Sequence, residues 1–134
     1  MTGGNTFFLL QHMRASGLDR LVRSRVDAGA LYVGCSAGAI VAGRSVATAT
    51  WKGWDDPTAA ADTDWSDAAC MRGLGLAARC SFFPHYADEW AELVRSRRGD
   101  LDHQLVCLED FGEAFVSPLE GPSGAERGGY DTEP

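Results

Sequence analysis

The pentapeptide GCSAG at residues 34–38 restricts the folds open to this chain more than any other segment. It follows a short apolar run at residues 30–33, which we expect to be a buried, parallel strand. It leads into the small apolar residues 37–42, which we expect to form a tightly packed helix. A serine between glycines at a strand-to-helix junction is the pattern of a nucleophile elbow. The segment therefore predicts an α/β fold that presents Ser36 on a sharp turn.

The elbow interpretation has a specific physical basis. The turn is tight, so the neighbours of Ser36 must be small, and the N–H groups at the start of the following helix can stabilise negative charge on a reacting carbonyl. The alternative is a glycine- and alanine-rich helix start that carries an incidental serine. The flanking strand and helix favour the elbow.

The rest of the chain alternates between helical and extended patterns. We expect helices over residues 7–15, 18–28 and 88–98, and strands over residues 45–50, 81–84, 104–108 and 113–116, the last returning as a hairpin partner of the strand before it. Residues 51–72 hold three of the four tryptophans and show no period, which indicates a long loop. This order predicts an α/β domain with a mainly parallel sheet flanked by helices. We expect that domain over residues 1–119 and a disordered tail over residues 120–134.

Charge and cysteine usage narrow the function classes. The net charge of −7 disfavours nucleic acid as a partner, because phosphate binding requires clustered Lys and Arg. No apolar run approaches the roughly 20 residues of a membrane span, and no signal peptide is visible, so we expect no membrane association and a cytoplasmic location with reduced thiols. The four cysteines show no metal-ligand spacing, and we expect no metal or cofactor.

A serine nucleophile needs a base, and His85 is the best placed of three histidines. It follows an apolar strand, and reacting groups gather at the carboxyl ends of strands in open α/β sheets. Ser36 and His85 would then share one edge of the sheet. We expect the other two histidines, His12 and His103, to be exposed at the surface.

A third group should orient the imidazole of His85. Asp110 ends the strand at residues 104–108 at the same edge, whereas Asp55 and Asp56 in the tryptophan-rich loop are alternatives. For the oxyanion, the N–H of Ala37 is one expected donor, and the glycine pair at residues 3–4 is a second source because glycine lets backbone approach a substrate closely.

Three segments together resemble the peptidase E family, the aspartyl dipeptidases with a glutamine amidotransferase-like fold: GGNTF at residues 3–7, VGCSAGA at 33–39 and FPHY at 83–86. The resemblance implies that Ser36 is the nucleophile and His85 the base, with the N–H groups of Gly4 and Ala37 as oxyanion donors. It implies hydrolysis of a small peptide through an acyl-enzyme. Asp110 matches the late of two acid positions assigned in the family, and Asp55 or Asp56 the early one.

Two departures from that family shape further expectations. The strands that precede GGNT in the family are absent, so the chain is either a naturally short form or a fragment. We expect its uncovered edge to be closed in a homodimer or higher oligomer. In the aspartate-selective members of the family an arginine binds the acidic side chain of the substrate. Residues 87–90 contain no matching arginine, so a strict preference for aspartyl substrates is in doubt. Trp51, Trp54 and Trp65 could line an apolar pocket instead.

Three alternatives to a peptidase remain at this stage. The same triad could serve an esterase, which would take a small ester substrate. A short chain could also retain the motif as a binding or assembly protein without activity. A glutamine amidotransferase would use a cysteine at the elbow, but Cys35 precedes the central position, which disfavours it.

Overall fold

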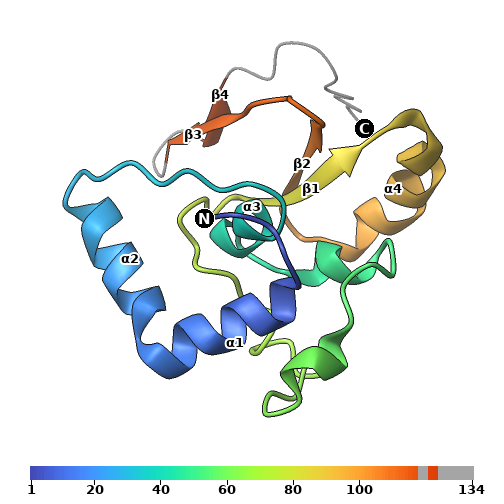
Figure 1. Cartoon of the computed structure of the whole chain (residues 1–134). Coiled ribbons are helices and arrows are strands. Elements are labelled where there is room, and N and C mark those ends of the chain that lie inside the picture. Colours follow the sequence, from blue (N-terminus) through green and yellow to red (C-terminus); the bar gives the residue numbers. More distant parts are fainter. Residues whose placement is uncertain (118–120, 124–134) are drawn as a thin grey trace.

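The structure, a computed structural model, describes residues 1–117 and 121–123 (Figure 1). Its helices and strands follow in the order α1 (Thr6–Ser16), α2 (Leu18–Asp27), α3 (Ala37–Ala42), β1 (Cys80–Tyr86), α4 (Ala91–Arg97), β2 (Gln104–Glu109), β3 (Phe115–Ser117) and β4 (Gly121–Ser123). Short 3₁₀ turns lie at η1 (Ala47–Thr50), η2 (Pro57–Ala60), η3 (Asp88–Trp90) and η4 (Arg98–Asp100).

The first two helices form where periodicity predicted them. Asn5 caps α1, because its side-chain oxygen accepts a hydrogen bond from the N–H of Phe8. Gly17 ends α1 in the left-handed region at φ 76°, which a glycine adopts without strain, and α2 begins directly after it. α3 also forms as predicted and is buried along its whole length.

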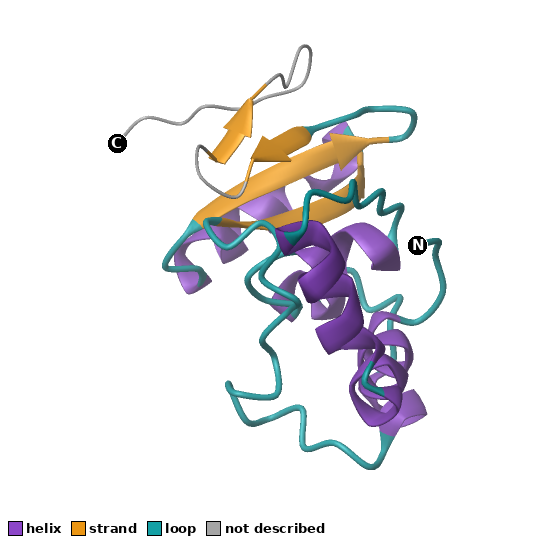
Figure 2. Ribbon diagram, turned by 90° about the vertical axis from the view of Figure 1, so that its left-hand side faces the viewer, coloured by secondary structure: helices purple, strands orange, loops and turns teal. Residues whose placement is uncertain are grey.

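β1 and β2 pair as a parallel sheet, with Phe83 opposite Cys107. α4 lies between the two strands in the sequence, as a parallel pair requires a crossover. Successive strand residues point to opposite faces, so Phe82 packs toward α3 and Phe83 packs toward Trp90 and α4. The sheet is therefore covered by α3 on one face and α4 on the other, which confirms the predicted α/β class. Figure 2 shows the strands grouped at one end of the molecule.

The loop at residues 51–72 is packed onto α1. Trp65 is buried and meets the ring of Phe7 edge-on at a centroid distance of 4.9 Å. Leu10 and Met13 of α1 are buried in the same cluster. The loop prediction is correct, and these contacts make the segment part of the core that α1 and α3 share.

Residues 30–33 differ from the prediction of a buried strand. They have no strand pairing, and the side chains of Leu31 and Val33 are 84% and 68% exposed. Their backbone is nevertheless tied down at one end, because the N-terminal amine of Met1 donates to the carbonyl of Val33 and the N–H of Cys35 donates to the carbonyl of Met1. The prediction of a buried strand at residues 30–33 is therefore wrong.

Two other strand predictions are wrong. Residues 47–50 form the turn η1, where the sequence had suggested a strand. β3 pairs antiparallel with β4, not with β2. Residues 121–123 are thus a strand inside the segment predicted as a tail, and the rest of that segment lies outside the described residues. The domain boundary at residue 119 remains a prediction.

None of the helices described here is long and apolar enough to span a lipid bilayer.

Candidate active site

Ser36 lies on a strained turn at the start of α3. Its backbone has φ 52° and ψ −120°, a conformation that residues with a side chain rarely adopt. The next residue, Ala37, begins the helix, so the hydroxyl of Ser36 stands beside a helix N-terminus. The backbone has the geometry that a nucleophile elbow requires.

Steric contacts explain both glycines of GCSAG. A Cβ atom at Gly34 would lie 2.5 Å from the carbonyl oxygen of Gly38, and one at Gly38 would lie 2.4 Å from the carbonyl oxygen of Met1. Both separations are well inside van der Waals contact. The sharp turn at Ser36 therefore depends on a hydrogen atom at Gly34, and the close approach of Met1 to α3 depends on one at Gly38.

His85 lies at an irregularity of β1. The register against β2 shifts between Pro84 and Tyr86, and His85 itself has φ 54°. A bulge of this kind re-aims a side chain at the end of a strand. Nε2 of His85 lies 3.0 Å from Oγ of Ser36, within hydrogen-bond distance.

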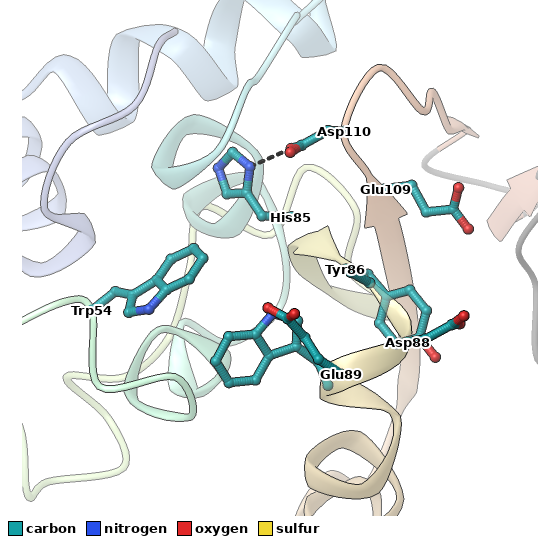
Figure 3. A pocket seen from close by; sticks show the side chains of 9 residues that line it. Trp54, His85, Tyr86, Asp88, Glu89, Glu109 and Asp110 are labelled. Atoms are coloured by element: carbon teal, nitrogen blue, oxygen red, sulfur yellow. Dashed lines mark hydrogen bonds and ion pairs between the residues drawn. The ribbon is translucent and has the colours of Figure 1, made fainter.

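Asp110 follows β2 directly and faces the other ring nitrogen of His85. Its Oδ1 lies 2.6 Å from Nδ1 (Figure 3). A carboxylate only accepts hydrogen bonds, so Nδ1 must carry the proton, which leaves the lone pair of Nε2 free to accept the proton of the Ser36 hydroxyl. The structure thus brings the three predicted side chains together in one line.

The two alternative acids are engaged elsewhere. Asp55 Oδ2 accepts hydrogen bonds from both the N–H and the hydroxyl of Thr6 at the start of α1. Asp56 Oδ1 accepts from the N–H and the hydroxyl of Thr58 and caps η2. These two aspartates hold the ends of helices, and Asp110 holds the imidazole.

The predicted oxyanion donors lie close to Ser36. A Cβ atom at Gly3 would lie 3.3 Å from Cβ and 3.4 Å from Oγ of Ser36, so the glycine pair passes directly beside the hydroxyl. Gly4 has φ 128°, a value that favours glycine, and a Cβ there would meet open space. Ala37 is the first residue of α3.

A cavity of about 510 Å³ opens beside His85 (Figure 3). Two tryptophans, Trp54 and Trp90, contribute to its wall and meet edge-to-face at 5.6 Å. The other lining residues are His85, Tyr86, Ala87, Asp88, Glu89, Glu109 and Asp110, a set that contains four carboxylates and no lysine or arginine.

Only one of the three tryptophans proposed for a pocket lines this cavity. Trp54 is 61% exposed and faces it, whereas Trp51 packs on Phe83 below the sheet and Trp65 packs on α1. Sequence reasoning missed Trp90, which comes from η3 after the strand of His85. The pocket wall is therefore more acidic and less apolar than predicted.

A second serine–histidine–aspartate line lies elsewhere in the structure. His103 Nε2 is 2.8 Å from Ser81 Oγ, and its Nδ1 is 2.7 Å from Asp102 Oδ1. Ser81 is fully buried and its Oγ also bonds to the N–H and the carbonyl of Ser45, so no substrate can reach it. The His103 side chain is only 6% exposed, which contradicts the predicted surface position. His12 is exposed as predicted.

The thiols differ in their surroundings. Cys35 is exposed beside Ser36. Burial raises the pKa of the Cys80 and Cys107 thiols to about 11, so both stay protonated at neutral pH. The described cysteines are all free.

Comparison with known proteins places this geometry in a family. The profile of peptidase family S51 matches residues 1–108. Over 86 residues the chain is 40% identical to the uncharacterized peptidase Lin0382 of Listeria innocua, and over 46 residues it is 54% identical to peptidase E of Pasteurella multocida. A crystal structure of a candidate peptidase E from Listeria monocytogenes EGD-e superposes with a TM-score of 0.64 at 29% identity.

The matched regions cover part of each relative. The alignments span 64% of this chain and 37% of Lin0382, and 34% of this chain and 20% of the Pasteurella peptidase E. The structural match covers 81% of this chain and 50% of the Listeria monocytogenes protein. The chain therefore corresponds to half or less of the length of these relatives.

Proposed function

Because this chain belongs to peptidase family S51, we propose that it hydrolyses short peptides through an acyl-enzyme on Ser36. The observation that carries the proposal is the continuous line from Ser36 Oγ through the His85 imidazole to Asp110, with separations of 3.0 and 2.6 Å. His85 and Asp110 of this line border an open cavity that can admit a small substrate.

The first half of the reaction forms the acyl-enzyme. Ser36 Oγ attacks the substrate carbonyl while its proton passes to Nε2 of His85, and Asp110 stabilises the resulting imidazolium through the Nδ1–H bond. The N–H groups of Gly4 and Ala37 would donate to the oxyanion, as their positions beside Ser36 allow. His85 then gives its proton to the leaving amine as the C–N bond breaks.

The second half releases the acyl group. Water enters, loses a proton to Nε2 of His85 and attacks the acyl carbon, and the proton returns to Ser36 Oγ as the ester bond breaks. Each proton that leaves a nucleophile thus returns to a leaving group, and these steps call on no metal or cofactor.

The cavity suggests which peptides fit. Asp88 and Glu89 lie where the resemblance would require a cation to bind an acidic side chain, and no lysine or arginine lines the cavity. Lys52 contacts the rings of Trp54 and Trp90 in the wall, but its Nζ already donates to the carbonyls of Pro84 and His85. Like charges repel across a few ångströms, so acidic side chains are disfavoured there. We therefore propose a broader preference for neutral or basic peptides.

Two alternatives use the same site. An esterase would employ the same three residues on an ester, and a binding protein would retain the geometry without turnover. Two measurements distinguish the peptidase, the esterase and the binding protein. The first is labelling by a fluorophosphonate probe, and the second is turnover of a panel of dipeptides and p-nitrophenyl esters. Labelling with peptide turnover supports the peptidase, labelling with ester turnover alone supports the esterase, and a folded protein that never labels refutes the hydrolase.

We also propose that the chain forms a homodimer or higher oligomer in the cytoplasm. The exposed side chains of Leu31 and Val33 on an unpaired extended segment support an edge that another copy covers. Solution scattering measures the mass directly, and a monodisperse monomer would contradict the proposal.

A further inference from the structure

His85 adopts a backbone conformation that requires support. Its φ of 54° lies in the left-handed region, which disfavours a residue with a Cβ atom, and it falls where the β1–β2 register shifts. The direction of the imidazole depends on the φ and ψ angles at this residue. These angles are fixed by the two peptide groups on either side of its Cα.

Lys52 holds both of those peptide groups. Its Nζ donates hydrogen bonds to the carbonyl of Pro84 at 2.8 Å and to the carbonyl of His85 at 2.6 Å. The first carbonyl belongs to the peptide before the Cα of His85 and the second to the peptide after it. One ammonium group therefore defines the backbone angles that aim the imidazole.

The ammonium group is itself held in a defined place. It lies 4.4 Å from the ring centroids of Trp54 and Phe83 and 4.9 Å from that of Trp90. Aromatic faces attract a cation, most strongly where water is partly excluded. The side chain is half-buried, and burial lowers the pKa of Lys52, which Asp110, Glu89 and Cys107 partly offset.

From these contacts we infer that Lys52 is a positioning residue that fixes the bulge at His85 and so aims Nε2 at Ser36. The inference rests on the proposed function, because it assigns a role toward His85 as the base. Lys52 is the only lysine in the sequence and lies between two tryptophans, Trp51 and Trp54. None of the described hydrogen bonds joins Lys52 to Ser36, and its Nζ donates only to backbone carbonyls, so we assign its effect to the backbone of His85.

The test compares Lys52→Met, which keeps an unbranched side chain without the ammonium group, with Lys52→Arg, which keeps donors and charge. Arg95→Met is the matched control for the lost positive charge, since Arg95 lies exposed on α4 and pairs only with Glu92 among the described contacts. We expect Lys52→Met to lower kcat and the fluorophosphonate labelling rate by about 10- to 100-fold with a small change in KM. Lys52→Arg should recover part of the loss, and Arg95→Met should match the wild type.

A spectroscopic measurement on the wild-type protein tests the inference without an activity assay and without a variant that could fail to fold. In wild-type protein with ¹⁵N-labelled histidine, the His85 ring signals should shift as Lys52 deprotonates at alkaline pH, and those of the distant His12 should not. Equal labelling rates in wild type and a folded Lys52→Met would overturn the inference. So would His85 ring signals that do not shift as Lys52 deprotonates. A wild type that never labels would instead refute the proposed function, and the His85 signals would still decide the role of Lys52.

Discussion

Nε2 of His85 lies 3.0 Å from Oγ of Ser36, although 49 residues separate the two in the sequence. Each residue has a positive φ, 52° at Ser36 and 54° at His85. Such conformations cost about 1–3 kcal/mol each and persist where surrounding contacts enforce them. The pair is therefore built from two strained turns, one at the start of α3 and one at the end of β1.

Replacing the hydroxyl at the elbow tests the nucleophile. Ser36→Ala removes the atom that would form the acyl-enzyme, and we expect fluorophosphonate labelling and peptide turnover to vanish. Cys35→Ala should retain both, because the Cys35 thiol precedes the elbow and is exposed to solvent. Turnover that survives in Ser36→Ala and disappears in Cys35→Ala would assign the chemistry to the cysteine instead.

Asp110→Asn tests the orienting carboxylate. The amide can donate to Nδ1, which favours the tautomer with the proton on Nε2 and blocks proton transfer from Ser36. By analogy with other triads we expect kcat to fall by about 10³-fold or more, with little change in the denaturation midpoint.

Asp55→Asn is the matched control for Asp110→Asn. Asp55 accepts two hydrogen bonds from Thr6 at the start of α1, so this variant should lose about 1–2 kcal/mol of folding free energy and keep kcat. Urea denaturation and steady-state kinetics on both variants check the contrast. A kcat loss in Asp55→Asn alone would restore the alternative triad.

The glycines of the elbow should be intolerant of a single methyl group. Gly34→Ala places Cβ 2.5 Å from the carbonyl oxygen of Gly38, so the turn must open, and we expect a loss of about 3 kcal/mol or more in denaturant titration. Gly99→Ala is the control, since a Cβ there meets no atom within 4 Å and it should be near neutral. Equal stability of the two variants would show that the turn is softer than the contacts imply.

The features that could be predicted from sequence are those encoded locally. α1 follows from its apolar spacing, and the elbow at Ser36 follows from glycines that no other residue could replace. His85 was placed correctly because a strand end determines which edge of the sheet a residue reaches. Each of these signals lies within a few residues of the feature it specifies.

The features that escaped prediction depend on distant contacts. The run at residues 30–33 has strand composition, but a strand also needs a partner, and none pairs with it in the described part of the chain. Lys52 carried no motif, and its importance arises only because β1 brings the carbonyls of Pro84 and His85 to it. A lysine between tryptophans was the one local signal that could have drawn attention to it.

Substrate charge tests the acidic cavity. Four carboxylates line it without a lysine or arginine, so a dipeptide with an acidic side chain should have a lower kcat/KM than its amide counterpart, by about tenfold. The comparison of Asp-X with Asn-X and of Glu-X with Gln-X keeps shape nearly constant. The difference should shrink at high salt, where exposed charges are screened. A preference for the acidic member of each pair would require a cation from outside this set of residues.

The line of Ser81, His103 and Asp102, in which Ser81 is buried and Asp102 is exposed, should act on stability and not on catalysis. Ser81→Ala removes an oxygen that bonds to the N–H and the carbonyl of Ser45 and to Nε2 of His103, and leaves these partly buried groups without that partner. An unsatisfied buried polar group costs about 1–3 kcal/mol, so the free energy of unfolding should fall by that order.

Labelling with a fluorophosphonate completes this comparison. Folded Ser81→Ala should react at the wild-type rate, because the Ser81 side chain is fully buried and cannot meet the probe. Ser36→Ala should show the reverse, with stability near that of the wild type and no labelling. The same three residue types would then support catalysis at Ser36 and stability at Ser81, and burial of the serine hydroxyl would determine the difference. Slower labelling of Ser81→Ala at unchanged stability would contradict this assignment of roles, because it would show that Ser81 affects the site at Ser36.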